Sequence, residues 1–180
     1  MRVWHQTDVP WWYNERPSLS LFAGAIWKVG GIALEEFSST REAPESLELP
    51  SGVQRLGRID LYFAYQGKHF VAEAKQCWPR IGSRAQSAKA EIEQMLLQAS
   101  ADVHRAPADY GQKLALVFAS PYFPRSEWEA APERLLQWKH VVESVTSDGK
   151  AFYWLHDCQR TGGDGFLYPG AGIFITQVTM

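Results

Sequence analysis

Two mostly apolar runs on either side of Gln66-Gly67 constrain the fold of this chain more than any other stretch of its sequence. Residues 55–65 and 68–76 have the length and composition of strands, and a short connection containing glycine is typical of a β-hairpin. The first run carries Asp60, and the second ends in Glu73-Ala74-Lys75. The sequence therefore predicts two neighbouring strands that carry charged groups beside a hydrophobic core.

The spacing of these charged groups suits metal chemistry. Residues i and i+2 of a strand share a face, so Glu73 and Lys75 point to the same side, and the short turn lets Asp60 approach them. Two carboxylates and the backbone carbonyl of Ala74 are hard oxygen ligands of the kind that Mg²⁺ prefers. A metal there would lower the pKa of bound water and offset charge on a phosphate, while Lys75 would orient the water or stabilise the transition state.

A surface ion-pair cluster is the alternative interpretation of Asp60, Glu73 and Lys75. Opposite charges across neighbouring strands are common, and each pair is worth only about 0.2–1 kcal/mol. Residues such as Leu61 and Phe70, however, make both strands largely apolar. Ionised groups beside a core usually have a function, so we favour a metal-dependent site.

The rest of the pattern predicts an order of elements around the hairpin. Apolar residues recur at helical spacing between Pro17 and Gly30, and residues 32–38 alternate like a strand. After the hairpin, an apolar stripe over 85–103 predicts an amphipathic helix, and the continuous apolar run 113–120 predicts a strand buried on both faces. The C-terminal extension is strand-rich and contains a helix over 127–142 and strands over 151–156 and 173–178.

This order and these residues resemble the PD-(D/E)XK nuclease superfamily, also called restriction-endonuclease-like. Asp60 and Glu73-Ala74-Lys75 match its motif on the second and third strands of an αβββαβ core, and the resemblance covers about residues 17–120. Ile59 stands where the name of the motif has proline. The resemblance implies an α/β fold with a mixed central sheet flanked by helices, in one domain over residues 1–180. It also implies that the Asp and Glu bind Mg²⁺, for which Mn²⁺ can substitute, and that the Lys assists the attacking water.

Members of this superfamily often add an acid near the first helix, and some carry a glutamine on the second. Glu15 is the preferred acid, and Glu35 and Glu36 are the other candidates. A negative charge that complements the helix dipole is the alternative interpretation of Glu15. Gln94 is the better candidate of Gln94 and Gln98, although an ordinary solvated helix face is the interpretation that we favour there.

Composition and charge limit the class of partner. A length of 180 residues with 46% hydrophobic content suits one compact domain. The net charge of −2 counts modestly against nucleic-acid binding, which depends on Lys and Arg neutralising phosphates, although a bound metal would offset an acidic site. Basic residues nevertheless gather around the motif, and solvated surface charge is the simpler interpretation of them. The predicted nucleic-acid surface comprises Arg58, Lys68, Trp78, Arg80, Arg84 and Lys89.

Together these features predict a metal-dependent nuclease that hydrolyses phosphodiester bonds of DNA, in restriction, phage defence or repair. An RNA-cleaving nuclease of the same fold and a non-catalytic protein-binding module are the alternatives. A homodimer or an accessory protein subunit is a further expected partner. With only two cysteines, no apolar stretch long enough for a bilayer and no signal-peptide pattern, the chain is expected to be cytoplasmic, with no membrane partner.

Overall fold

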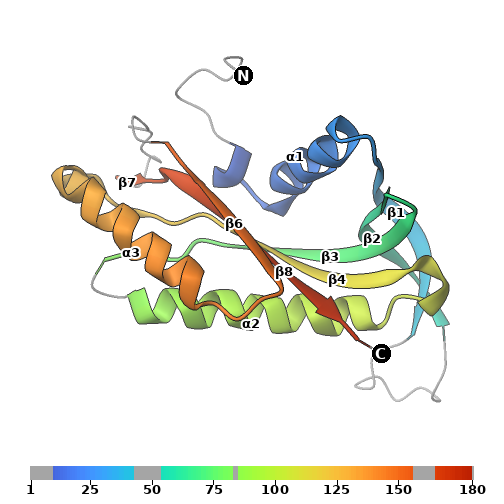
Figure 1. The fold of residues 1–180 in the computed structure, drawn as a ribbon. Coiled ribbons are helices and arrows are strands. Elements are labelled where there is room, and N and C mark those ends of the chain that lie inside the picture. The colour runs from blue at the N-terminus through green and yellow to red at the C-terminus, as the bar shows by residue number, and fades with distance from the viewer. Residues whose placement is uncertain (1–9, 43–53, 83–84, 156–164, 180) are drawn as a thin grey trace.

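The computed structural model describes residues 10–42, 54–82, 85–155 and 165–179. Its main feature is one mixed sheet of six strands, whose spatial order is β1-β2-β3-β4-β8-β6 (Figure 1). β3 and β4 are parallel, and every other adjacent pair is antiparallel. The strands of this sheet are β1 (Ile32–Glu42), β2 (Gln54–Tyr65), β3 (Lys68–Cys77), β4 (Gln112–Ala119), β6 (Gly149–Trp154) and β8 (Gly170–Val178).

Helices cover both faces of the sheet, which confirms the predicted α/β class. α1 (Glu15–Lys28) packs on one face, and α2 (Ala85–His104) and α3 (Ala131–Ser144) pack on the other (Figure 1). None of the helices described is long and apolar enough to cross a membrane. The short elements are η1 (Pro10–Trp12), η2 (Ala108–Tyr110), η3 (Arg125–Ala130) and a small sheet of β5 (Phe123–Pro124) with β7 (Phe166–Leu167).

The central strand β4 explains why two cores form. Its residues from Lys113 onward are all buried, as the continuous apolar run predicted. Alternate side chains enter different clusters because strand side chains point to opposite faces. The cluster on the α1 side contains Leu114, Leu116 and Phe118. The cluster on the α2 side contains Ala115, Val117 and Ala119.

Local chemistry sets the ends of α1 and the hairpin. α1 begins at Glu15 because the Asn14 side chain caps it by accepting a hydrogen bond from Arg16 N (3.2 Å). Pro17 therefore lies within the first turn, where its missing N–H has no intrahelical partner to lose. The predicted hairpin is confirmed: Gln66 and Gly67 both have positive φ, as a two-residue type I′ turn requires.

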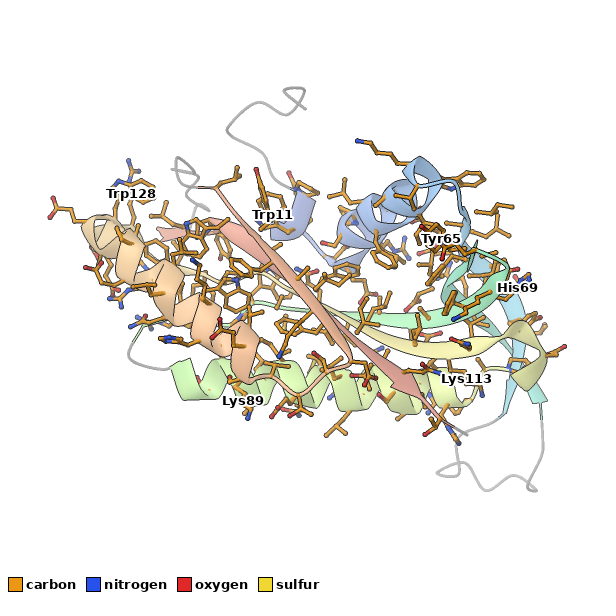
Figure 2. The ribbon with its side chains drawn as sticks, in the orientation of Figure 1. Trp11, Tyr65, His69, Lys89, Lys113 and Trp128 are labelled. Atoms are coloured by element: carbon orange, nitrogen blue, oxygen red, sulfur yellow. The ribbon has the colours of Figure 1, made fainter. Side chains whose placement is uncertain are left out.

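The segment before α1 is anchored beside the carboxyl ends of β3 and β4. The Trp11 carbonyl accepts hydrogen bonds from Gln76 Nε2 (3.1 Å) and from Ser120 Oγ. Its indole N–H donates to the carbonyl of Tyr168 (3.3 Å), close to the start of β8. Figure 2 shows Trp11 on η1, on the same side of the sheet as α1. These bonds fix the approach of the chain to the first turn of α1.

Candidate functional site

β2 and β3 separate at the level of Asp60. Their pairing runs from Tyr65–Lys68 to Leu61–Ala72 and stops there. In a regular ladder the next hydrogen-bonded pair would join Ile59 to Ala74. Instead, the Ala74 N–H donates to Asp60 Oδ2 (2.9 Å). The Asp60 carboxylate thus replaces a main-chain acceptor at the gap between the two strands, which we call the fork.

Both β1 and β2 change face at this level. Leu61 packs in the cluster on the α1 side, whereas Ile59 packs with Val103 of α2. Residues two apart in a regular strand share a face, so β2 is kinked at Asp60. On β1 the residue opposite is Glu36, whose φ of 50° lies in the left-handed region that non-glycine residues rarely adopt. The matched kinks accompany the opening of the fork.

Glu73 and Lys75 project from β3 on the side of α2. The alternate residues Ala72 and Ala74 belong to the cluster on the α1 side, so Glu73 and Lys75 face the other way. Glu73 is buried, with 4% of its surface exposed, and Lys75 is half-buried. The structure therefore places the two charged side chains on one face, as the spacing predicted.

Asp102 of α2 is the ion-pair partner of Lys75. Lys75 Nζ lies 2.6 Å from Asp102 Oδ2, and Arg105 Nη2 lies 2.6 Å from the other Asp102 oxygen. Burial alone would lower the pKa of Lys75, but the hydrogen bond to Asp102 and the charges of Asp102, Glu73 and Asp60 raise it. Lys75 is therefore firmly cationic. Burial opposes ionisation of Asp102, yet its bonds to Lys75 and Arg105 lower its pKa.

Glu15 lies at the start of α1, on the face of the sheet opposite α2. Burial raises the pKa of its carboxyl, and the charge of Asp60 raises it further, while Lys75 and Arg16 lower it. The charges of Asp60 and Lys75 thus act on the Glu15 carboxyl, which relates the preferred acid to the fork electrostatically.

The other two candidate acids have partners of their own. Ser20 Oγ donates to Glu35 (2.7 Å) on the α1 side of the sheet. Glu36 forms ion pairs with Arg16 (3.0 Å) and Arg58 (3.1 Å). These contacts favour Glu15 over both as the additional acid.

The structure does not bring Gln94 to the fork. α2 packs on the sheet through residues such as Ile92, and Gln94, two positions on, is rotated by about 200° around the helix. Gln94 is exposed accordingly, and so is Gln98. The residue of α2 that reaches Lys75 is instead Asp102. Its position depends on the rotation of α2 about its axis, which the spacing of the sequence alone does not give.

The predicted nucleic-acid surface divides into separate places. Arg58 is exposed on β2, in the ion pair with Glu36. Lys68 lies at the hairpin turn, five residues from Glu73, which corresponds to roughly 17 Å along the strand. Lys89 is on α2 and pairs with Glu93 (3.7 Å). Figure 2 shows Lys89 well apart from His69, the neighbour of Lys68.

Two members of that surface follow Lys75 directly. Trp78 comes just after β3 with 37% of its surface exposed, and its backbone N–H donates to the carboxyl of Glu91. Arg80 is half-buried and forms an isolated bridge with Tyr122. Arg84 lies outside the described residues. Trp78 and Arg80 therefore lie just beyond the carboxyl end of β3, whereas Arg58 lies two residues before Asp60 on β2.

The fork presents oxygen atoms of the kind that a hard divalent cation binds. No group of three or more His, Cys, Asp or Glu side chains in the described part of the chain is arranged to hold a metal ion. The predicted site needs fewer side chains: Asp60, Glu73 and the carbonyl of Ala74. The N–H and C=O of a strand residue point the same way, so the Ala74 carbonyl faces the fork with its N–H. A carboxylate has about four lone-pair sites, so Asp60 keeps acceptor capacity, and Mg²⁺ usually retains several waters.

Three predicted residues therefore lie at the fork, Asp60, Glu73 and Lys75, and the charges of Asp60 and Lys75 act on a fourth, Glu15. They come from β2, β3 and the start of α1, and α2 adds Asp102, which the sequence prediction omitted. Comparison of the chain with models of known protein families, with curated proteins and with solved structures finds no significant match.

Proposed function

We propose that the chain is a metal-dependent nuclease of the PD-(D/E)XK type that hydrolyses phosphodiester bonds of DNA. The observation that carries the proposal is the Asp60 carboxylate in the fork, bonded to the Ala74 N–H between Glu73 and Lys75. The order of helix, three antiparallel strands, helix and a strand parallel to the third supports it. So does the effect of the Asp60 charge on the carboxyl of Glu15.

Each group has a chemical role in this proposal. Asp60, Glu73 and the Ala74 carbonyl would hold Mg²⁺, which activates water and offsets charge on the phosphate when bound. Lys75 has three N–H donors, and its bond to Asp102 leaves donors for an attacking water or a phosphate oxygen. Because burial raises the pKa of Glu15, its carboxyl accepts a proton more readily than an ordinary glutamate, which suits a group that receives the proton of the water.

A substrate screen with matched variants tests the proposal. Duplex DNA, single-stranded DNA and RNA are incubated with the wild type in Mg²⁺, Mn²⁺ or EDTA. We expect metal-dependent cleavage of DNA, lowered about 100-fold or more by Asp60→Asn, Glu73→Gln or Lys75→Ala. Glu129→Gln and Lys139→Ala change exposed residues of η3 and α3 and should cleave normally. Cleavage that survives all three site substitutions contradicts the proposal, and cleavage confined to RNA changes only the substrate.

Metal binding gives a test that needs no substrate. Titration calorimetry with Mn²⁺ should show one binding event in the wild type and in Glu129→Gln, and none in Asp60→Asn. A wild type that does not bind Mn²⁺ contradicts the proposed site and favours a non-catalytic role for the fold.

A further inference from the structure

A chain of ion pairs reaches from α2 to the ammonium of Lys75. Asp102 bonds Lys75 through one oxygen and Arg105 through the other, each at 2.6 Å. Arg105 Nη1 also donates to the carbonyl of Ala101 (3.2 Å), so both ends of the guanidinium are held. All three side chains are two-thirds or more buried, with 28% of Lys75, 28% of Asp102 and 33% of Arg105 exposed. Arg105 therefore holds Asp102 from one side, and Lys75 bonds it from the other.

The position of Asp102 matters because two other carboxylates also attract the ammonium of Lys75. The charges of Glu73 and Asp60 both act on its ammonium. A lysine side chain is flexible, and its ammonium is a compact point charge. An unrestrained Lys75 would be drawn toward those two carboxylates and would compete with any cation for them. Asp102 lies on α2, outside the fork, and holds the ammonium on that side.

We propose that Asp102, braced by Arg105, is a positioning residue. It keeps the Lys75 ammonium beside the fork and prevents it from neutralising Asp60 and Glu73. This role rests on the proposed metal-dependent function, because it concerns which cation those two carboxylates receive. It would also separate the two positive charges of the proposed chemistry, a metal held by Asp60 and Glu73 and the ammonium of Lys75.

The geometry distinguishes this ion pair from an ordinary one on the same helix. Lys89 and Glu93 of α2 are 3.7 Å apart and lie one turn from each other, the arrangement of a weak surface pair. Asp102 instead joins α2 to β3, at hydrogen-bond distance and with both oxygens used. Bonds to ionised partners at this distance are the stronger kind.

A double variant separates positioning from simple loss of structure. Asp102→Asn keeps the size of the side chain and removes its charge, so we expect the Mn²⁺ affinity to fall about tenfold. Adding Lys75→Ala to Asp102→Asn removes the competing ammonium and should restore the affinity. Glu127→Gln is the matched control, because it breaks another 2.6 Å ion pair, with Arg134 between η3 and α3, and should leave Mn²⁺ binding unchanged.

Two further measurements complete the test. ¹³C relaxation at Cε of Lys75 should show an ordered side chain in the wild type and a mobile one in Asp102→Asn. With the substrate found in the screen, Asp102→Asn should lower kcat about tenfold and leave KM unchanged, because substrate contacts are intact. Asp102→Glu keeps the charge and should recover part of kcat.

The outcomes separate this inference from the proposed function. Lys75 equally ordered in Asp102→Asn, or a double variant that binds Mn²⁺ as weakly as Asp102→Asn, overturns the positioning role. A wild type that neither binds Mn²⁺ nor cleaves nucleic acid overturns the proposed function instead. In that case the relaxation measurement still decides whether Asp102 holds Lys75.

Discussion

The carboxyl of Glu15 is a group whose ionisation is opposed by burial and by the charge of Asp60. Burial is the larger cause of the raised pKa of Glu15, and the charge of Asp60 adds to it. A carboxyl with a raised pKa in the folded state keeps its proton after the unfolded chain has lost its own. The folded state is therefore penalised as pH rises past the ordinary value of 4.5, and it carries no penalty well below that pH.

Glu15→Gln should accordingly stabilise the protein near pH 7 and have little effect near pH 3. The measurement is the free energy of unfolding from urea denaturation at the two pH values, in EDTA so that no metal contributes. Glu129→Gln, at an exposed position, serves as the control and should show no such difference. An equal gain at both pH values would contradict the predicted coupling.

Metal binding should also raise the thermal stability of the folded state. A ligand at 100 times its Kd stabilises a protein by about 2.7 kcal/mol, which for a chain of this size raises Tm by roughly 5–10 °C. We expect this shift with saturating Mn²⁺ in the wild type and none in Asp60→Asn, because that variant lacks the charged oxygen in the fork. Differential scanning fluorimetry measures it, and a shift that persists in Asp60→Asn would place the metal elsewhere.

At the scale of elements, one glycine determines how β4 lies beside β3. Gly111 has a φ of 112°, and a Cβ there would lie 2.4 Å from the carbonyl oxygen of His69. The first pair of the parallel ladder, Phe70 with Gln112, follows directly. A side chain at this position would push the two strands apart where their pairing begins.

Gly111→Ala should therefore destabilise the fold by about 2–5 kcal/mol, the combined cost of backbone strain and overpacking. Gly67→Ala is the control: Gly67 also has positive φ, but open space surrounds its Cβ position, so its cost should be about 1 kcal/mol. Urea denaturation of both variants tests the difference, and equal costs would show that contact with His69 is unimportant.

The elements also show what the sequence could predict. α2 and β4 agree with prediction to within a residue at each end, because their apolar periodicity directly reflects burial. The predicted start of the first helix at Pro17 was wrong. α1 begins at Glu15, because the Asn14 side chain caps it there. The regular alternation expected through residues 32–38 ends at Glu36, where β1 passes from one core to the other.

The sequence predicted the strand residues of the candidate site but not Asp102, its residue on α2. Asp60, Glu73 and Lys75 could be related because hairpin register follows from the length of the turn. Asp102 lies on an element whose rotation about its axis depends on how α2 packs after the crossover. Gln94 illustrates the same limit, since spacing alone did not show that it points away from the sheet.

At the scale of the whole molecule, the C-terminal strands belong to the same sheet as the candidate site. β8 pairs with β4 on one edge and β6 on the other. Trp138 of α3 is fully buried and packs edge-to-face on Phe174 of β8, at 6.4 Å between ring centres. A Cβ at Gly172 would lie 2.9 Å from the same indole, so β8 is shaped around it.

Trp138→Ala should cost about 3–5 kcal/mol and should destabilise the fork as well as α3. We expect circular dichroism and tryptophan fluorescence to report one shared urea transition in the wild type and in the variant. Separate transitions would mean that the C-terminal strands unfold independently of β2 and β3.

The proposed function implies that nucleic-acid binding should depend on metal, because a net charge of −2 gives little overall attraction for phosphate. Without a cation, the carboxylates at the fork repel phosphate. Fluorescence anisotropy with duplex DNA should therefore show about tenfold tighter binding in Ca²⁺ than in EDTA, and Asp60→Asn should bind more tightly than the wild type in EDTA. Equal affinity of the wild type under both conditions would contradict a phosphate-binding role for the fork.

The matched kinks in β1 and β2 allow the fork to be removed without changing the rest of these two strands. The pairs on either side, Glu35–Leu61 and Phe37–Ile59, keep one register, so Glu36 and Asp60 amount to one additional residue in each strand. Deleting both residues together would leave each flanking side chain on its present face and restore ordinary alternation. Deleting either residue alone would put β1 and β2 out of register. A paired deletion of Glu36 and Asp60 would therefore remove the candidate site and keep both cores. A single deletion would disrupt the pairing of β1 with β2.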